Sequence, residues 1–282
     1  DYFDWPYDHE PAPTKIPGGA LEYAVSDWGK VLSAELDIQT ATVEVKWKSG
    51  VILKTFIHAT QPNGWFTIEH LPSAFTINLI APRYNDSVKN VADPVGGDDL
   101  GRLGYPQGKV IKKNNSITYL QKGWGGFQYK ITLQWKFTSP NTVEGAWTIS
   151  TANSSKDFLD DQAYLKGELQ KGFGAHLSSH LAWWKKFWSR SAIKIPDPVL
   201  EKQWYLEQYK FGSCSRRGAP PISLQAIWTA DNGRIPPWKG DYHHDLNTQL
   251  SYWPAYSGNH LEEAMAYLDH LDQNKKNYKR YT

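Results

Sequence analysis

The segment from Val43 to Thr60 reads VEVKWKSGVILKTFIHAT, and its pattern decides the fold of the first half of the chain. Apolar and charged residues alternate from Val43 to Lys48, which is the period of two expected for a strand with one buried face. Ser49–Gly50 then predicts a tight turn, and the β-branched residues that follow predict a second strand up to Thr60. We interpret this segment as an antiparallel hairpin.

Short apolar runs of the same kind recur up to about Ser154. Turn-forming residues separate them at Pro62–Gly64, Gly123–Gly126 and Pro140–Asn141. About ten strands without an intervening helix are typical of an antiparallel β-sandwich, which we place at residues 1–155. The further predicted strands are Trp65–His70, Phe75–Ile80, Ser116–Leu120, Phe127–Phe137 and Thr142–Ile149.

The second half of the chain shows helical periodicity. Asp197 followed by Pro198 predicts the cap and first residue of a helix that ends near Ser213. A later helix is predicted to begin at Asn259, with a buried stripe of Leu261, Ala264, Met265, Leu268 and Leu271. An earlier helix is predicted from the one-face spacing of Leu177, Leu181, Trp184 and Trp188. Strands first and helices afterwards indicate an α+β chain with segregated domains.

The composition excludes several classes of protein. The chain has 31 Lys+Arg against 29 Asp+Glu and no basic cluster, which argues against binding to nucleic acid or to a charged membrane. A single cysteine, Cys214, excludes an internal disulfide framework. No apolar run approaches the ~18 residues of a membrane span, so we expect no membrane insertion. The 14 Trp and 16 Tyr suit a large core and a carbohydrate-binding surface alike.

A long aromatic- and proline-rich connection precedes the last predicted helix, and ordered connections of this length often line a site. If Tyr242–Asn247 is extended, His243, Asp245 and Asn247 lie on one face. An imidazole, a carboxylate and an amide can together hold sugar hydroxyls and a hydrolytic water. The alternative is that Asp245 only caps the following helix and that His243 bonds to a backbone carbonyl.

A metal site is a further possibility in this stretch, because Asp241, His243, His244 and Asp245 are all potential ligands. Adjacent histidines point apart, however, and no pair has the i, i+4 spacing of a helical metal site. We therefore predict no metal ion and no other cofactor.

Three motifs in this stretch occur in a fixed order: LQAIW at Leu224–Trp228, PPW at Pro236–Trp238 and NTQLSYWP at Asn247–Pro254. In these motifs the chain resembles glycoside hydrolase family 95, whose members carry N-L-Q-G-I-W, P-P-W and N-I-N-x-x-M-N-Y-W-P-A in the same order. Arg216–Gly218 also resembles the S-R-P-G loop of that family. The resemblance is close over Arg216–Glu262 and looser elsewhere.

The resemblance implies an inverting exo-glycosidase that removes terminal α-L-fucose or L-galactose. It also implies an N-terminal β-sandwich (residues 1–155), a helical linker (156–195) and the first helices of an (α/α)6 barrel (196–282). Twelve helices with their loops need roughly 200 residues, far more than the last segment offers. We therefore expect most of the barrel, including the general acid, to lie beyond Thr282, and this chain alone to be inactive.

In the family, two asparagines separated by one residue position the attacking water, and a histidine two residues earlier contacts substrate. These positions fall on Asp245, Asn247 and His243. Because a carboxylate is a stronger base than an amide, Asp245 is the candidate base and Asn247 orients the water. Glu262 and Glu263 are interpreted as solvated first-turn carboxylates rather than the acid. Other candidate substrate-binding residues are His244, Trp228, Trp238 and Trp253.

Two alternative functions remain open at this point. One is a carbohydrate-binding module, in which the tryptophans of the sandwich bind glycan. The other is a different six-hairpin enzyme, such as a phosphorylase or a trehalase-like hydrolase. In each case the expected partner is an oligosaccharide or polysaccharide, together with the missing C-terminal part of the barrel. The resemblance implies a periplasmic or extracellular bacterial enzyme, although this chain carries no signal peptide.

Overall fold

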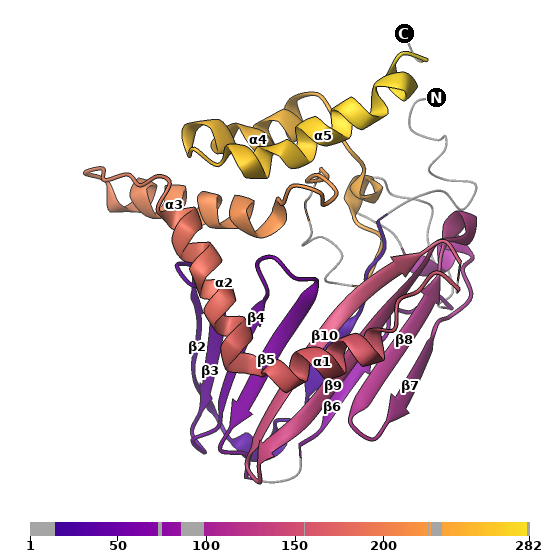
Figure 1. The fold of residues 1–282 in the computed structure, drawn as a ribbon, viewed down its shortest axis with the longest axis vertical. Coiled ribbons are helices and arrows are strands. Elements are labelled where there is room, and N and C mark those ends of the chain that lie inside the picture. The colour runs from indigo at the N-terminus through magenta and orange to yellow at the C-terminus, as the bar shows by residue number, and fades with distance from the viewer. Residues whose placement is uncertain are drawn as a thin grey trace.

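The computed structural model describes residues 15–72, 75–85, 99–154, 156–224, 226 and 233–280. A large antiparallel sheet leads into helices that cross its outer face and then form a layer above its end (Figure 1). The strands are β1 (Ala20–Tyr23), β2 (Val31–Asp37), β3 (Thr42–Trp47), β4 (Ile52–Ile57), β5 (Asn63–Glu69), β6 (Ile77–Ile80), β7 (Lys109–Lys113), β8 (Ser116–Lys122), β9 (Gln128–Ser139) and β10 (Thr142–Ala152). The α-helices are α1 (Asp161–Lys171), α2 (Phe173–Trp188), α3 (Pro198–Cys214), α4 (Leu246–Ser257) and α5 (Leu261–Tyr278). Short 3-10 helices are η1 (Ser26–Trp28), η2 (Leu100–Leu103), η3 (Trp124–Gly126) and η5 (Pro237–Gly240).

Eight strands form one antiparallel sheet in the order β2-β3-β4-β5-β10-β9-β8-β7. The predicted hairpin is its β3–β4 pair, closed by a hydrogen bond of 3.0 Å from the Trp47 N–H to the Val51 carbonyl. Each of the seven predicted strands corresponds to an observed one, and all ten described strands precede α1. The predicted α+β class is therefore confirmed. Strands β1, β2 and β7 were not among the ranges predicted, because their short runs carry no clear alternation.

The main hydrophobic core lies on the inner face of the large sheet. Within the described ranges, a two-stranded sheet of β1 and β6 packs against this face as the second layer. Strand β6 contributes Ile77 and Leu79, which lie against alternate residues of β5, β8, β9 and β10. The residues of that set that are almost inaccessible to solvent are Phe66, Ile68, Ile117, Tyr119, Leu133 and Val143.

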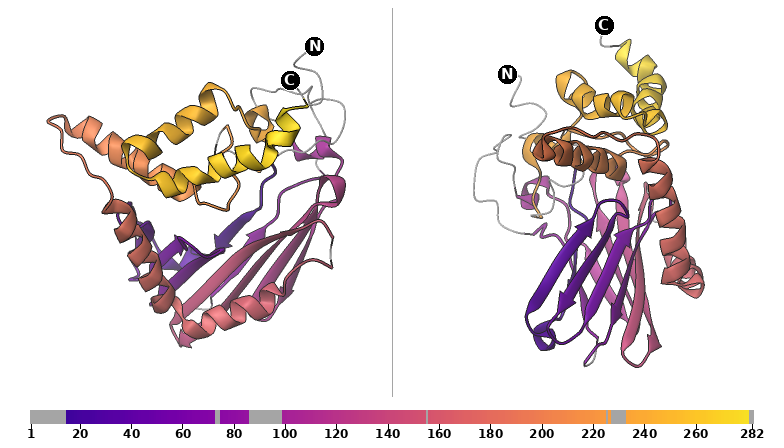
Figure 2. Two further views of the ribbon diagram at one scale, coloured as in Figure 1. Left: turned by 45° about the horizontal axis from the view of Figure 1, so that its top comes forward. Right: turned by 90° about the vertical axis from the view of Figure 1, so that its left-hand side faces the viewer.

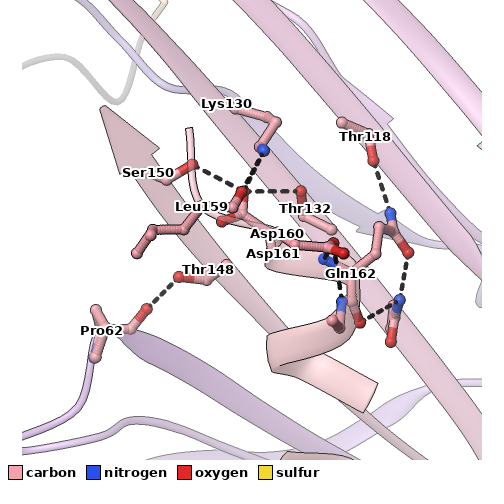
Figure 3. A network of polar contacts seen from close by, with 12 residues as sticks. Pro62, Thr118, Lys130, Thr132, Thr148, Ser150, Leu159, Asp160, Asp161 and Gln162 are labelled. Carbon is pink, nitrogen blue, oxygen red and sulfur yellow. Dashed lines mark hydrogen bonds and ion pairs between the residues drawn. The ribbon is translucent and has the colours of Figure 1, made fainter. Parts of the chain in front are cut away.

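Helix α1 lies across the outer face of the same sheet and is attached by polar contacts at its first turn (Figure 3). Asp160 caps the helix, and its carboxylate accepts a hydrogen bond of 3.1 Å from the Gln162 N–H. The buried carboxylate of Asp161 forms an ion pair of 3.1 Å with Lys130 and accepts a hydrogen bond of 2.8 Å from Ser150 Oγ. Buried apolar residues complete the attachment of α1 and α2, namely Phe56, Trp65, Ala146, Leu165, Leu169 and Phe173.

Helix α2 leaves the sheet and leads up to the helical layer (Figure 2). The helix predicted from the one-face spacing of Leu177, Leu181, Trp184 and Trp188 is present; of these four residues Trp184 is buried and the other three are only half-buried. Two of the buried positions of α2 carry histidines, His176 and His180, beside the aromatic residues Phe173, Trp184 and Phe187. The physical reason is that the helix packs there against the turn between β4 and β5, whose backbone groups need hydrogen-bond partners.

The side chain of His58 forms hydrogen bonds with the backbone of that turn. Its Nδ1 accepts hydrogen bonds from the backbone N–H groups of Thr60 (3.2 Å) and Gln61 (3.1 Å). A ring nitrogen that accepts carries no proton, so His58 is the neutral tautomer with its proton on Nε2. That proton is donated to Ser179 Oγ at 2.8 Å. The His58–Ser179 pair is therefore structural, because Nε2 of His58 already carries a proton and cannot act as a base toward the Ser179 hydroxyl.

Ala59, the next residue, is bound by two helical elements. Its N–H donates to Nδ1 of His180 at 3.2 Å, while Nε2 of His180 donates to the Thr40 carbonyl at 2.7 Å. The Ala59 carbonyl accepts a hydrogen bond of 2.8 Å from Nε of Arg216, which follows α3. The Arg216 guanidinium also stacks on Trp183 of α2, 3.7 Å from the ring centroid. We call the contacts of Ala59 with His180 and Arg216 the Ala59 junction.

Helix α3 begins as predicted. The carboxylate of Asp197 accepts a hydrogen bond of 2.8 Å from the Val199 N–H, and Pro198 is the first helical residue. The helix ends at Cys214, one residue past the predicted end. At Gly212 it passes so close to Phe187 of α2 that an added Cβ would lie 2.7 Å from the ring.

Helix α5 differs from the prediction at its start and in its buried face. Its N-cap position is His260 rather than Asn259. Leu261 and Leu268, predicted to be buried, are exposed, whereas Tyr267 is buried. The helix packs on α4 through the face that carries Tyr267, so Leu261 and Leu268 point away from that contact, whereas Leu271 packs against it as predicted. The residues of this smaller core are Phe211, Ile222, Tyr252, Ala255, Ala264 and Tyr267.

We predict that the free energy of unfolding decreases as the pH falls from about 6.5 to about 4. Burial lowers the pKa of His58 from 6.5 to about 4, and burial also lowers that of His180. Below pH 6.5 the unfolded chain therefore binds protons that the folded chain does not, and stability that is fully present above this pH is lost. The contribution of His58 is at most about 3 kcal/mol. Urea unfolding at a series of pH values measures it.

The matched variant for this prediction is His58→Asn. The asparagine amide oxygen can accept the same backbone N–H groups, as in an Asx turn, but it does not titrate. Its unfolding free energy should depend less on pH than that of the unaltered chain. An identical pH dependence would show that the His58 ring is not the responsible group.

A second stability prediction concerns Gly145 of β10. A Cβ added there would lie 2.1 Å from the ring of the buried Phe66, so Gly145→Ala should destabilise the fold by about 1–3 kcal/mol. Gly167 in α1 has open space around it, and Gly167→Ala should stabilise by about 0.5–1 kcal/mol. Chemical denaturation of both variants tests the pair, and shifts of the same sign would contradict it.

Candidate active site

The connection between α3 and α4 carries the residues predicted from the sequence (Figure 1), and one of its backbone N–H groups is bonded to a side chain of α4. The Ile222 N–H donates to the hydroxyl of Tyr252 on α4 at 2.8 Å. The Leu224 N–H donates to the Asp241 carbonyl at 2.8 Å. The two contacts fix the start of the connection against the segment that leads into α4. Trp228, a predicted substrate-binding residue, lies outside the described residues.

The expectation that Tyr242–Asn247 is an extended segment is wrong. The backbone is extended at Asp241, but it turns at His244–Asp245, and α4 begins at Leu246. His243, Asp245 and Asn247 therefore do not share one face of an extended segment. The physical reason is that the helical hydrogen bonding starts early, since the Thr248 N–H donates to the His243 carbonyl at 2.9 Å. The predicted start of a helix near Asn247 is correct to within one residue.

Asp245 occupies the N-cap position of α4, but its side chain makes no capping hydrogen bond. The alternative in which Asp245 only caps the helix is therefore wrong as well. The carboxylate of Asp245 and the amide of Asn247 are both exposed at the first turn of α4. This arrangement leaves an anion and an amide accessible beside the N-terminus of a helix, where negative charge is favoured.

His243 is paired with Asp241 instead of Asp245. Its Nε2 lies 3.0 Å from Oδ1 of Asp241, and Trp238 meets its ring edge to face with centroids 6.1 Å apart. Trp238 has a φ of 55°, a left-handed conformation that is uncommon for a bulky residue. From the sequence, Asp241 was identified only as a potential metal ligand. Asp241 lies two residues before His243, and side chains at this spacing in an extended segment point to the same side. This spacing could have predicted the pair.

His244 lies at the centre of an aromatic cluster. Its ring stacks against Tyr242 and Tyr267, with centroids 5.6 and 5.9 Å apart. Its Nδ1 lies 3.4 Å from the Tyr267 hydroxyl, and its Nε2 lies 3.3 Å from the Tyr278 hydroxyl. Burial, and then the neighbouring His270, lower the pKa of His244. Both ring nitrogens thus have protein partners, and a contact with substrate stays a prediction.

The last predicted aromatic contact, Trp253, projects from α4 with 55% of its surface exposed. Leu246 and Leu250 on the same face of the helix are also exposed. The three residues have the i, i+4, i+7 spacing of a single apolar stripe. Trp253 is therefore accessible, on a surface that none of the described residues covers.

The two glutamates at the start of α5 differ from each other. Glu262 is exposed and lies 3.5 Å from Arg217, as expected of a solvated first-turn carboxylate. For Glu263 that prediction is wrong, because only 4% of its surface is exposed and it forms an ion pair with Arg190. A buried carboxylate needs such a partner, and Arg190 at the end of α2 supplies it.

Two negative findings apply to the part of the chain that the structure describes. Within the described ranges, no three His, Cys, Asp or Glu side chains come together as a group that could hold a metal ion. None of the described helices combines the length and the apolar character that crossing a bilayer requires.

Comparison with protein families shows where the resemblance lies. Residues 184–282 match the glycosyl hydrolase family 95 catalytic domain. The matched residues include the connection, α4 and α5, as well as the end of α2 and all of α3. The resemblance to glycoside hydrolase family 95 is thus confirmed over this segment.

Curated relatives agree with this match. "Probable alpha-fucosidase A" from Aspergillus niger is 27% identical over 36% of this chain, and its namesake from Aspergillus oryzae is 33% identical over 28%. "Alpha-L-fucosidase 2" from Arabidopsis thaliana is 35% identical over 29% of this chain. The chain covers only 16%, 11% and 10% of these three relatives, respectively.

Among solved structures, the chain resembles "Putative kojibiose phosphorylase from human microbiome", with a TM-score of 0.51 and 13% identity. The match covers 76% of this chain and 35% of that chain. At this identity the likeness concerns the fold alone. It extends the similarity beyond the helices to a sheet-rich domain followed by helices.

We predict that His270→Gln raises the pKa of His244. In the unaltered protein this pKa lies below 6.5, because the ring is buried and a second histidine cation would be close to it. The glutamine removes the repulsion but leaves the burial, so the pKa should rise without passing 6.5. Proton NMR titration of the histidine rings measures the shift. His58, far along the chain on the sheet, is the internal control, and a pKa of His244 that does not move contradicts the prediction.

Proposed function

We propose that this chain is part of an inverting exo-glycoside hydrolase of the family 95 type that removes terminal α-L-fucose or L-galactose from glycans. The observation that carries the proposal is the match of residues 184–282 to the catalytic domain of that family. The names of the three curated relatives support the fucosidase type. The chain covers at most 16% of the length of each of these relatives, and we propose that the activity requires more of such a protein than this chain contains.

In the proposed reaction Asp245 is the general base. Its carboxylate takes a proton from water while the water oxygen forms a bond to the anomeric carbon. The bond from that carbon to the leaving oxygen breaks on the opposite side, and the leaving oxygen takes its proton from a carboxylic acid. Support for this role comes from the exposure of Asp245 and from its freedom from helix capping.

Asn247 and His243 orient the reactants in this proposal. The Asn247 amide is exposed within the same helical turn and can hold the attacking water by a hydrogen bond. In this proposal His243 carries its proton on Nε2, which lies 3.0 Å from Oδ1 of Asp241, so its Nδ1 can accept a hydrogen bond from a sugar hydroxyl. Asp241 fixes the ring in this tautomer and is therefore a positioning residue.

The general acid is assigned to the part of the barrel beyond Thr282. An inverting reaction places its two carboxyl groups roughly 6.5–9.5 Å apart, with room for the water. Exposed apolar residues on the outer side of α3 and α4 support the presence of such further helices. Leu200, Leu250 and Trp253 line a groove of about 620 Å³ between the two helices, and further barrel helices would cover it.

A sugar phosphorylase of related fold is the second candidate function. The likeness to a kojibiose phosphorylase favours it at the level of fold, although not of site chemistry. The two functions differ in the nucleophile, because a phosphorylase releases a sugar phosphate only when phosphate is present. A periplasmic or extracellular location stays a prediction.

The test uses the longer protein that contains this chain, with an aryl α-L-fucoside and a fucosylated oligosaccharide as substrates. Hydrolysis should be independent of phosphate, and NMR should detect the β-anomer of fucose as the first product. Asp245→Asn should lower kcat by about 10²–10⁴-fold, since it removes the base. Asp272→Asn, an exposed aspartate on α5, is the matched control and should leave kcat unchanged.

Turnover that Asp245→Asn leaves unchanged would remove this residue from the mechanism while the hydrolase class stands. Phosphate-dependent formation of a sugar phosphate would replace the hydrolase by a phosphorylase. Hydrolysis of the fucoside by the isolated chain would contradict the proposed need for the rest of the barrel.

A further inference from the structure

A cleft of about 970 Å³ lies where the end of the sheet meets the helical layer. Its sheet side is formed by β2, β3, β4, the turn after β4 and β10, and its helical side by α2, α3, the 216–219 loop and the start of α5. It shares no lining residue with the candidate active site at residues 241–253. Its volume is at the upper end of the range of ~300–1,000 Å³ found for small-molecule sites.

Arg216 brings a cation with free donors to this cleft. Its Nε donates to the Ala59 carbonyl, and its Nη1 donates to the carbonyls of Gly212 and Ser215. A guanidinium has five N–H groups, so the two on Nη2 remain, and Nη2 has no hydrogen-bond partner among the described residues. The side chain is half-buried and lines the cleft, and Nη2 is not enclosed by protein.

No carboxylate of the described residues forms an ion pair with Arg216. The two glutamates that line the cleft are already paired, Glu262 with Arg217 at 3.5 Å and Glu263 with Arg190. Burial lowers the pKa of Arg216 to about 10, and the neighbouring Glu263 offsets this effect only in part. The guanidinium is therefore charged at neutral pH but poorly solvated. A cation in this state gains more from a bound anion than a cation in bulk water does.

The sheet side of the cleft is an apolar wall. The indole of Trp147 on β10 lies against Gly64 of β5, so closely that a Cβ on Gly64 would be 2.1 Å from the ring. Ile57 of β4, the ladder partner of Gly64, is 63% exposed, and Leu36 of β2 is 49% exposed. Both line the cleft, as does the half-buried Trp147. Covering this preformed surface with an apolar molecule is favourable.

The cleft offers few partners to a molecule rich in hydroxyl groups. Thr55 and Ser213 donate their hydroxyl protons to backbone carbonyls, at 2.7 and 2.9 Å. His58 uses both ring nitrogens within the protein. The unpaired side-chain atoms of Gln61 and Trp184 are enclosed and cannot reach a ligand. These contacts disfavour a sugar, whose hydroxyls would lose their bonds to water.

From these observations we infer that the cleft binds a small monocarboxylate with a flat apolar body, such as an aryl carboxylate. The carboxylate accepts hydrogen bonds from Nη2 of Arg216, and the apolar body packs on Trp147 and Ile57. The two halves of the site are adjacent, because Ala59, whose carbonyl binds Arg216, is two residues from Ile57. A single uncompensated positive charge matches a single negative one. The inference does not rest on the proposed hydrolase activity, because the cleft and the candidate active site have no residue in common.

The test is isothermal titration calorimetry of the chain at pH 7 with three probes. 2-Naphthoate carries both the apolar body and the charge, 2-naphthamide carries the body alone, and acetate carries the charge alone. 2-Naphthoate should bind with a Kd below about 1 mM, and 2-naphthamide at least about tenfold more weakly. Acetate should give no heat of binding up to about 10 mM.

Two exposed isoleucines provide a matched pair of variants. Ile57→Glu places a negative charge inside the cleft and should weaken 2-naphthoate by about tenfold or more. Ile111→Glu makes the same change on β7 outside the cleft, at a residue that is 55% exposed, and should bind as the unaltered chain does. Arg216→Gln removes the cation and should make the affinities for 2-naphthoate and 2-naphthamide equal.

Four results would overturn the inference. The first is no heat from 2-naphthoate up to about 10 mM. The second is equal binding of 2-naphthamide to the unaltered chain. The third is equal affinity of Ile57→Glu and Ile111→Glu for 2-naphthoate. The fourth is binding that Lys166→Gln abolishes while Ile57→Glu leaves it intact, which would place the anion in the groove beside α1 that Lys113, Lys136 and Lys166 line. If Arg216→Gln fails to fold, the pair of isoleucine variants decides the question.

Discussion

The backbone N–H and the carbonyl of Ala59 both form hydrogen bonds with side chains of the helical half of the chain. The position of the helical layer depends on these two contacts. His180 of α2 accepts the N–H, and Arg216 after α3 donates to the carbonyl. A second contact of the same kind joins Trp188 of α2 to the Ile38 carbonyl at 3.1 Å. Side chains from the helices thus satisfy backbone groups at the end of the sheet that strand pairing leaves open.

This arrangement explains why histidines lie beside Trp184 on the buried face of α2, where the sequence suggests leucine. A neutral imidazole accepts at one nitrogen and donates at the other, so a single ring can bridge the Ala59 N–H and the Thr40 carbonyl. Leucine cannot do this. The consequence is a contact that depends on the charge of His180, because protonation would place a second N–H against that of Ala59.

Patterns that depend on neighbouring residues in the sequence predicted the structure well. The alternation after Val43 and the Asp197–Pro198 cap both gave the observed elements, because strand faces and helix caps are set by local geometry. The buried faces of α2 and α5 were predicted less well. Which face is buried depends on the partner element, as Tyr267 against α4 and His180 against the Ala59 turn show.

The candidate site illustrates the same distinction. The sequence correctly predicted a helix that begins near Asn247. The predicted extended conformation of the residues before it is wrong, because the Thr248 N–H of α4 donates a hydrogen bond to the His243 carbonyl. The His243–Asp241 pair is a local relation that the sequence contained. The aromatic cluster around His244 brings together residues from α5 and the connection, so no single stretch could reveal it. The roles of Asp245 and Asn247 stay predictions.

Amide hydrogen exchange at the turn after β4 tests the Ala59 junction most directly. If His58 and His180 hold this turn, the amides of Ala59, Thr60 and Gln61 are protected at pH 7. Lowering the pH to about 4 should remove the protection of Thr60 and Gln61, whose N–H groups His58 accepts, and the protection of Ala59 should fall when His180 binds a second proton, while that of Phe66 and Ile131 within the sheet persists. Unprotected exchange of the three amides at pH 7, or loss of their protection only when the sheet itself unfolds, would contradict the account.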